Sequence, residues 1–190
     1  QEPLNISWGR DLTIRNPSTD TAMIDGDWGT QLLVLDRAAT VVLENLILTR
    51  GSSRSRGGAV HASAGSKLNA FNCTFKDNIA TGGGGAVYAQ DASLSFAGDA
   101  LFEENTAQRG SGGALLAEKT RVILKGDVFL GSNSAQGTGG GGAIACVDGS
   151  ALVITGRARL ERNRADTVGG AITIEDSSVT MNGNIDFSRN

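Results

Sequence analysis

Five copies of a Gly-Gly-Ala tripeptide, each followed by valine, leucine or isoleucine, recur at intervals of 27, 28, 29 and 28 residues. The glycine pairs of these copies are Gly57 and Gly58, Gly84 and Gly85, Gly112 and Gly113, Gly141 and Gly142, and Gly169 and Gly170. Repetition at a near-constant period of this length is typical of proteins built from stacked structural repeats. We interpret the glycine pairs as tight turns at the corners of each repeat, where a positive φ is needed.

A second motif follows each glycine pair and ends in an asparagine. These asparagines are Asn78, Asn105, Asn133, Asn163 and Asn190, and the third residue before each is phenylalanine or leucine. A short stretch of alternating apolar and polar residues lies between the two motifs, so each unit has three short strands separated by three turns. Side-chain amides stacked at one turn can bond each other and the neighbouring backbone, so we expect a structural asparagine ladder.

Strands too short to bury a face alone must stack on their neighbours. The sequence therefore predicts an all-β fold, a right-handed parallel β-helix of six to seven three-stranded coils about 4.8 Å apart. A β-propeller or a helical repeat is the alternative. The period is short for a four-stranded blade, however, and it lacks the 3.6-residue rhythm of helices.

Alternation along the first strand of each unit predicts which side chains face the core. Val87 and Leu115 should stack inward as neighbours in one column. The alanines after the glycine pairs, and the column that contains His61 and Tyr88, should point outward. We expect His61, the sole histidine, to be exposed and without the partners that a metal ligand or general base requires.

The repeat pattern extends over the whole chain. We expect residues 1–190 to form a single β-helix domain, in which residues 1–56 make irregular N-terminal coils and residues 57–190 make the five repeats. The last coil ends at Asn190 without a polar or helical cap. We therefore expect the natural chain to continue as part of a longer protein.

The paired GGA[ILV] and FxxN motifs of residues 57–190 resemble the polymorphic outer membrane protein repeat, which was first described in chlamydial surface autotransporters and also occurs in other bacterial and eukaryotic surface proteins. Leu130 and Leu160 stand where this family has phenylalanine, which keeps an apolar core position. The resemblance implies a β-helix with an adhesive or surface-structural role. It covers five units and does not extend to residues 1–56.

Composition excludes several function classes. With 17 Lys and Arg against 20 Asp and Glu, the chain lacks the basic excess that binds nucleic acid. No apolar run approaches the roughly 18 residues of a membrane span. The glycine runs lack the following helix and the Lys-Ser/Thr pair of a phosphate-binding loop. We expect no cofactor and no metal.

Two carboxylates are the best enzymatic candidates in the sequence. Asp99 and Asp127 occupy the same outward position in neighbouring coils, as a glycosidase or a polysaccharide lyase would require. Arg157 follows in the next coil, so a cross-strand charge ladder is the simpler interpretation, and we expect no enzyme activity. A second acidic cluster of Asp20, Asp25 and Asp27 lies in a turn-rich stretch, where aspartate favours local backbone bonds.

Four apolar side chains occupy positions that should face outward. They are Leu101, Ile123, Phe129 and Val153. Contiguous exposed apolar surface marks interfaces, although isolated surface hydrophobes are also normal. The pattern predicts a lateral contact centred on Phe129.

Two tripeptides match the N-glycosylation signature, and they begin at Asn5 and Asn72. Asn72 should face outward. Cys73 and Cys146 should lie inward three coils apart, about 14 Å, which is too far for a disulfide. We expect two free, buried thiols.

These features favour a non-enzymatic extracellular or cell-surface module, a rigid structural or adhesive stalk that contacts a protein, a glycan or neighbouring copies. Glycosylation would be compatible with this location. The alternative is a polysaccharide-binding or polysaccharide-cleaving, pectate-lyase-like β-helix, in which Asp99 and Asp127 would act. Ice binding is disfavoured because no outward threonine column is present.

Overall fold

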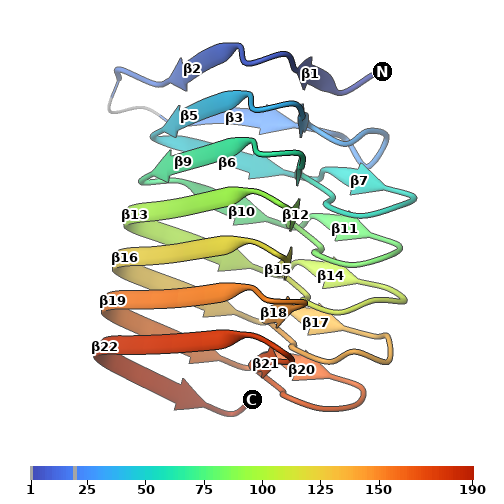
Figure 1. Ribbon diagram of the computed structural model, residues 1–190, viewed down its shortest axis with the longest axis vertical. Helices are drawn as coiled ribbons and strands as arrows, with labels where there is room; N and C mark the ends of the chain where they lie inside the picture. Colours follow the sequence, from blue (N-terminus) through green and yellow to red (C-terminus); the bar gives the residue numbers. More distant parts are fainter. Residues whose placement is uncertain (1, 19–20) are drawn as a thin grey trace.

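The computed structural model describes residues 2–18 and 21–190, and in these ranges every regular element is a β-strand. The strands wind into a stack of seven coils with the two ends of the chain at opposite ends of the stack (Figure 1). Strand pairs in all three sheets are parallel. The predicted all-β parallel β-helix is therefore confirmed.

Sheet A contains one strand from each coil, in chain order. Its strands are β1 (Leu4–Ile6), β4 (Leu33–Leu35), β8 (Val60–Ala62), β12 (Val87–Gln90), β15 (Leu115–Glu118), β18 (Ile144–Val147) and β21 (Ile172–Ile174). The register pairs Val87 with Leu115, both buried, as the stacking of like residues predicts.

Sheet B forms the long side of the stack. In the first three coils it has two strands per coil: β2 (Asp11–Arg15), β3 (Ala22–Asp25), β5 (Thr40–Glu44), β6 (Leu46–Thr49), β9 (Lys67–Phe71) and β10 (Thr74–Lys76). In the last four coils one strand replaces each pair: β13 (Ser93–Glu103), β16 (Arg121–Gly131), β19 (Ala151–Glu161) and β22 (Ser178–Ser188). The expectation of separate second and third strands is thus wrong for these coils.

A glycine lies in the middle of each long strand of sheet B. The four residues pair in register across the coils: Gly98, Gly126, Gly156 and Gly183. Gly126 has φ +105, and a Cβ there would lie 2.6 Å from the carbonyl oxygen of Gly98. Only glycine allows the strand to bend this close to its neighbour, so the column divides each strand into a first and a second half.

Sheet C is a ladder of two-residue strands, four of which directly follow a ladder asparagine while the first follows Gly51. It comprises β7 (Ser52–Ser53), β11 (Ile79–Ala80), β14 (Thr106–Ala107), β17 (Ser134–Ala135) and β20 (Arg164–Ala165). The sequence analysis missed these strands, because two residues show no alternation. These strands form the third parallel sheet of the β-helix.

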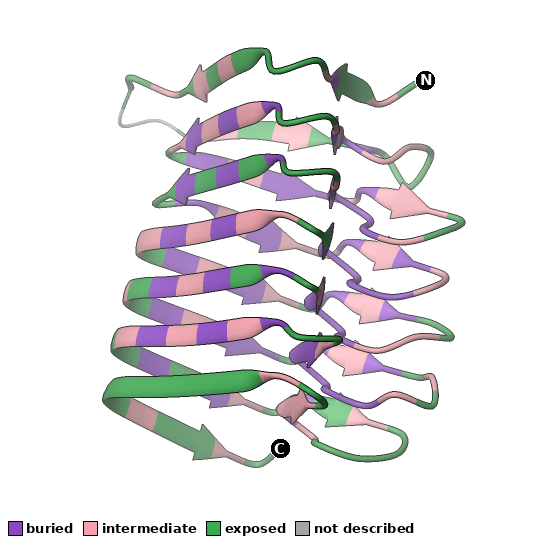
Figure 2. Cartoon of the chain, viewed as in Figure 1, coloured by how far each residue is buried: buried purple, intermediate pink, exposed green. Residues whose placement is uncertain are grey.

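The core runs the length of the stack as columns of apolar side chains. Along each half of β16 and β19 buried positions alternate with half-buried or exposed ones, which Figure 2 shows as stripes. Phe75 and Phe102 stack with ring centroids 4.9 Å apart, and Phe96 contacts both rings edge-on. Aromatic pairs in these geometries add to the stabilisation from burial.

On sheet A the outward assignment is wrong for the alanines, which pack in the main core, whereas the column of Tyr88 lies outside that core as predicted but is buried rather than exposed. The alanines after the glycine pairs are buried, and Tyr88 and Leu116 retain only 2% and 5% of their exposure. Together with Ala145 and the half-buried Val147 these two residues form a second apolar cluster outside the main core. The corner turns cover it, since a Cβ on Gly83 would lie 2.6 Å from Leu116 Cδ2.

The two glycines of each pair meet different requirements. Gly112 has φ +65, which glycine adopts without steric cost. Gly113 has no positive φ, but a Cβ there would overlap the carbonyl oxygen of Gly142 and lie 2.5 Å from the backbone nitrogen of Ser134. The expectation of a positive φ at both glycines is therefore wrong for the second, where adjacent coils approach too closely for a side chain.

The asparagine side chains form a hydrogen-bonded ladder inside the stack. Asn78 Nδ2 donates to Asn105 Oδ1 at 3.0 Å and to the carbonyl oxygen of Leu48 at 3.1 Å. The pattern repeats through the remaining steps, which link Asn105, Asn133, Asn163 and Asn190. Each amide before Asn190 therefore joins three coils, and these four members are buried.

A second ladder, made of hydroxyl groups, lies at another corner of the coils. Thr120 Oγ1 accepts from the backbone N–H of Ala92, Ser150 Oγ from that of Thr120, and Ser177 Oγ from that of Ser150. Ala92 interrupts the column, and Ser66 Oγ in the coil before it is buried without a hydrogen-bond partner. The sequence analysis did not detect this ladder.

Candidate functional site

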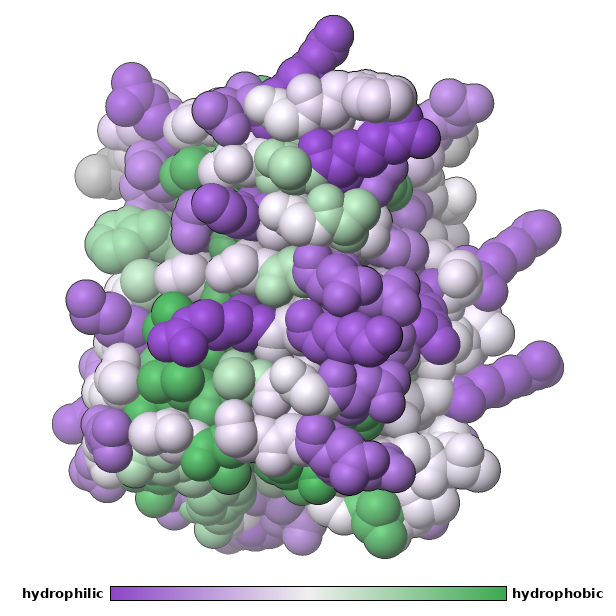
Figure 3. Space-filling view, in the orientation of Figure 1, coloured by the Kyte–Doolittle hydropathy of each residue, from purple (hydrophilic) through white to green (hydrophobic). Residues whose placement is uncertain are grey.

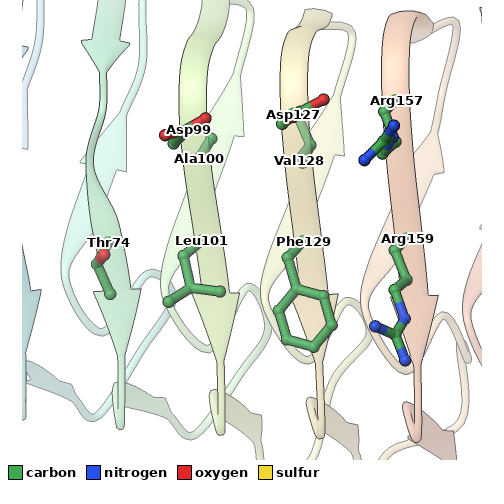
Figure 4. Close-up of a pocket in the computed structure, with 9 residues that line it drawn as sticks. All are labelled: Thr74, Asp99, Ala100, Leu101, Asp127, Val128, Phe129, Arg157 and Arg159. Atoms are coloured by element: carbon green, nitrogen blue, oxygen red, sulfur yellow. The ribbon is translucent and has the colours of Figure 1, made fainter.

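Two rows of side chains cross the second halves of the long strands of sheet B (Figure 4). Together with Thr74 on β10 they line an open depression of about 430 Å³. We name this surface the lateral face, and it comprises Thr74, Asp99, Leu101, Asp127, Phe129, Arg157 and Arg159.

Strand register places these residues side by side. Asp99 pairs with Asp127, and Asp127 with Arg157, in consecutive coils. Two residues further along the same strands, Leu101 pairs with Phe129 and Phe129 with Arg159. The residues between the two rows point into the core, so both rows stand on the outer surface at the spacing of neighbouring strands.

The charged side chains of the first row are exposed and unpaired. Although the register sets Asp127 beside Arg157, no ion pair within 4.0 Å joins them, and none involves Asp99, in the part of the chain that the structure describes. The backbone N–H of Asp99 donates to Asn72 Oδ1 at 3.0 Å. The expected cross-strand charge ladder is therefore not formed as direct ion pairs.

The second row has an apolar centre and a basic end. Leu101 and Phe129 are half-buried, and Arg159 lies 5.9 Å from the ring centroid of Phe129. Arg159 Nη2 also contacts Glu161 Oε2 at 2.5 Å, and this ion pair helps to fix the guanidinium over the ring. A cation held this way over an aromatic face is attracted by the quadrupole of the ring.

The structure divides the four apolar residues that the sequence analysis grouped. Leu101 and Phe129 meet on the lateral face. Ile123 and Val153 are also half-buried, but they lie on the first halves of β16 and β19, before the glycine bend. In Figure 3 hydrophobic surface gathers over the C-terminal coils on the side of these first halves. The candidate interface thus lies on two surfaces rather than one.

A network missed by the sequence analysis lies outside sheet A. Arg56 Nη1 donates to Tyr88 Oη at 2.6 Å and to Glu118 Oε1 at 2.8 Å, and Tyr88 Oη donates to Glu118 Oε2 at 2.7 Å. Burial, followed by the hydrogen bond and charge of Glu118, raises the pKa of Tyr88 to about 12. The phenol is held protonated, so the cluster joins coils and supplies no base.

His61 packs against this network, and the expectation of an exposed imidazole is wrong. Its ring meets that of Tyr88 edge-on at 4.9 Å, and the residue is half-buried. Burial, with the nearby charge of Arg56 as a second cause, lowers the pKa of His61. A neutral imidazole beside an arginine has a packing role here.

The two described members of the second acidic cluster, Asp25 and Asp27, have a local partner in Arg50. Asp25 accepts from Arg50 Nε at 2.9 Å, and this hydrogen bond is the main cause that lowers the pKa of Asp25. Asp27 lies 3.4 Å from Arg50, whereas Asp20 falls outside the described residues. Within residues 2–18 and 21–190 no group of three or more His, Cys, Asp or Glu could hold a metal ion.

The two sequons lie in exposed positions, but their environments differ. Asn5 lies on β1. The side chain of Asn72 bonds neighbouring coils, since Nδ2 donates to Asn45 Oδ1 at 3.2 Å while Oδ1 accepts from Asp99. A glycan on Asn72 would compete with these bonds. Cys73 and Cys146 are both free and buried, and burial raises their pKa, that of Cys146 to about 12.

The comparisons with known proteins give one family. A model of the Chlamydia polymorphic membrane protein repeat matches residues 72–90, a segment that contains Phe75, Asn78 and the pair Gly84 and Gly85. Neither the curated proteins nor the solved structures gave a match to the chain. None of the described residues forms a helix long and apolar enough to cross a membrane. Residues 72–90 of this parallel β-helix are therefore similar to the repeat of the Chlamydia polymorphic membrane proteins, a family of surface and outer-membrane proteins.

Proposed function

We propose that this chain is a non-enzymatic structural and adhesive module of a cell surface, a stiff β-helical spacer whose lateral face contacts a protein or a glycan. The observation that carries the proposal is the unbroken register of β13, β16, β19 and β22, which pair over all eleven residues of each strand. A solenoid in which every coil bonds only its neighbours is quasi-one-dimensional and projects its surface away from its base.

The interior of the stack supports the role of a spacer. The asparagine ladder joins each coil to the next by side-chain bonds that are buried away from water. Buried hydrogen bonds in a low dielectric are strong when all partners are satisfied, and they resist bending of one coil relative to another. The lateral face is open and shallow, as is typical of contact surfaces rather than of catalytic clefts.

Surface location is tested on intact cells of the native source. Antibodies against the described chain should label unpermeabilised cells, and brief external protease treatment should remove the label. Labelling that appears only after permeabilisation would contradict the proposal.

Adhesive contact is tested with beads coated with the purified protein. Attachment to cells of the native source, or to immobilised glycans, should fall when Phe129→Asp places a charge in the apolar centre of the lateral face. Thr155→Asp is the matched control, because Thr155 lies on β19 before the bend and pairs with Lys125. Equal attachment of wild type and Phe129→Asp would rule out this face.

Polysaccharide binding or cleavage is the second candidate, favoured by the stacked carboxylates of Asp99 and Asp127. Neighbouring strands are about 4.8 Å apart. Retaining glycosidases place their two carboxyls about 5–5.5 Å apart. If this function holds, plant and bacterial polysaccharides should yield new reducing ends or unsaturated products, and Asp99→Asn or Asp127→Asn should abolish them. Adhesion that survives both substitutions, without any products, would favour the first proposal.

A further inference from the structure

The charges of the lateral face are ordered along the axis of the stack. From β13 to β22 the first row reads Asp99, Asp127, Arg157, Asn184, and the second row reads Leu101, Phe129, Arg159, Asp186. The first row is therefore acidic toward the N-terminal coils and basic one coil further on. The charges of such a surface are therefore complementary to those of a second copy whose stack axis runs in the opposite direction.

An antiparallel second copy would satisfy this order. A two-fold axis parallel to the strands, placed between β16 and β19, sets Asp127 of each copy opposite Arg157 of the other. The same axis sets Phe129 opposite Arg159 of the other copy, Asp99 opposite Asn184 and Leu101 opposite Asp186. An isologous contact forms each of these pairs twice, so one favourable pair contributes two interactions.

The other registers are less favourable. Shifting the axis by half a coil, onto β16, sets Asp99 opposite Arg157 but brings Asp127 opposite its own copy. A further half-coil shift brings Asp99 opposite Asp127. A parallel dimer about an axis along the stack would align each coil with its own equivalent. An axis over the first row sets aspartate against aspartate, and an axis between the two rows sets Arg157 against Arg159. Like charges placed opposite each other oppose association, and the antiparallel register between β16 and β19 avoids them.

The side chains involved are available for a partner. Neither Asp127 nor Arg157 takes part in an ion pair in the described ranges, and both are exposed. Leu101 and Phe129 keep part of their apolar surface in contact with water. An interface gains both by removing this apolar surface from water and by neutralising steering charges.

We propose that the lateral face binds a second copy of this chain in antiparallel orientation, centred between β16 and β19. The inference rests on the proposed function, since it names the protein partner of the same face. Antiparallel pairing is the arrangement that spacers projecting from two opposed surfaces would make. Four strands span only about 20 Å, so the contact is small, and we expect weak association that falls as salt screens the charges.

The first experiment uses charge reversal and sedimentation velocity at high protein concentration and low salt. Wild type should associate, and the single variants Asp127→Arg and Arg157→Asp should each lose about tenfold or more in association constant. An equimolar mixture of the two variants should associate again, because both cross-pairs become acid against base. Lys125→Asp is the matched control, since Lys125 is exposed on β16 before the bend. Circular dichroism checks that every variant is folded.

The second experiment fixes the orientation by oxidative cross-linking. Asp127→Cys mixed with Arg157→Cys should yield a mixed disulfide, whereas each variant alone should yield little dimer. The native cysteines are buried and should remain unreactive. Dimer formed by each variant alone would show the parallel arrangement and overturn the inference. So would single charge reversals that associate like wild type, or association that appears only when a polysaccharide is added.

The two proposals fail in different ways. If the chain labels intact cells and its beads attach, but the purified protein sediments as a monomer, the antiparallel dimer is wrong and the adhesive module stands. If the charge-reversed mixture associates but the chain is inaccessible on intact cells, the surface function is wrong and the self-contact stands.

Discussion

Asn105 and Asn133 occupy equivalent positions in neighbouring coils, and Asn133 Oδ1 accepts both the backbone N–H of Asn105 at 3.0 Å and its side-chain Nδ2 at 2.9 Å. One oxygen thus satisfies two donors that water cannot reach. Because the same relationship repeats along the stack, the stability of each coil depends on the coil beside it.

Removing one member of this ladder should be costly. Asn105→Ala leaves the backbone N–H of Asn78 and the carbonyl oxygen of Phe75 without their partners. Each buried unsatisfied group costs about 1–3 kcal/mol, so the free energy of unfolding should fall by about 2–5 kcal/mol in urea titrations. Asn182→Ala, at an exposed position on β22, should change it by about 0.5 kcal/mol or less. Equal effects would show that the ladder contributes nothing.

Substitution by alanine should destabilise the protein more at the second glycine of a pair than at an exposed glycine with a positive φ. Gly113→Ala forces a methyl group into the backbone of the next coil, and we expect a loss of about 3 kcal/mol or more, or failure to fold. Gly149 has φ +83 but no atom near its Cβ position, so Gly149→Ala should cost only about 1–2 kcal/mol. Thermal unfolding ranks the two variants. The reverse order would contradict the close approach of the coils.

The raised pKa of Tyr88 predicts that the folded protein loses stability at alkaline pH. Its pKa is raised from 10.0 in the unfolded chain to about 12 in the fold, so its contribution is complete below pH 10 and is lost between pH 10 and 12. Tyr88 is the single tyrosine, so phenolate absorbance reports it directly. The folded protein should titrate near pH 12, and Glu118→Gln should lower that midpoint. A midpoint near 10 in both proteins would contradict the network.

The lowered pKa of His61 predicts that the folded protein also loses stability at acid pH. Its pKa is lowered below 6.5 in the fold, so its contribution to stability is present above pH 6.5 and is lost as the pH falls below that value. As the sole histidine it gives a single Hε1 signal in proton NMR, whose shift follows the titration. Arg56→Gln removes a neighbouring cation and should raise the pKa. An unchanged titration in that variant would show that the charge of Arg56 does not lower the pKa of His61.

Completing the hydroxyl ladder should stabilise the protein. Ala92→Ser places a hydroxyl in the coil next to Ser66, whose Oγ is buried and unpartnered. One added hydrogen bond contributes about 0.5–1.5 kcal/mol, and urea titration should detect a gain of that size. Ala97→Ser, at a half-buried outer position on the same strand as Leu101, should be neutral. A destabilised Ala92→Ser protein would mean that the corner has no room for the hydroxyl.

The repeat period was enough to predict the stack, the columns and the asparagine ladder. Equivalent residues one period apart must lie one above the other in a parallel β-helix, so Val87 and Leu115 could be paired from the sequence. The glycine column from Gly98 to Gly183 was also visible in the sequence at equivalent positions, and its role as a bend was overlooked. Sheet C gave no periodic signal because its strands have only two residues.

The lateral face was predicted in part. The sequence placed Leu101 and Phe129 on the outside and Asp99 beside Asp127, since both statements follow from alternation and register. It also grouped Ile123 and Val153 with them, because alternation alone does not reveal that the strand bends between the two halves.

The sequence by itself determined the fold class, the apolar columns such as that of Val87 and Leu115, and the order of charges along the rows, because these depend on one coil being like the next. The tertiary structure alone decided what covers the outside of each coil. Tyr88 became buried because corner turns fold over sheet A, and Arg56 met Glu118 across 62 residues. Such contacts depend on the paths of turns, which carry no repeating pattern of hydrophobicity, so no periodicity in the sequence encodes them.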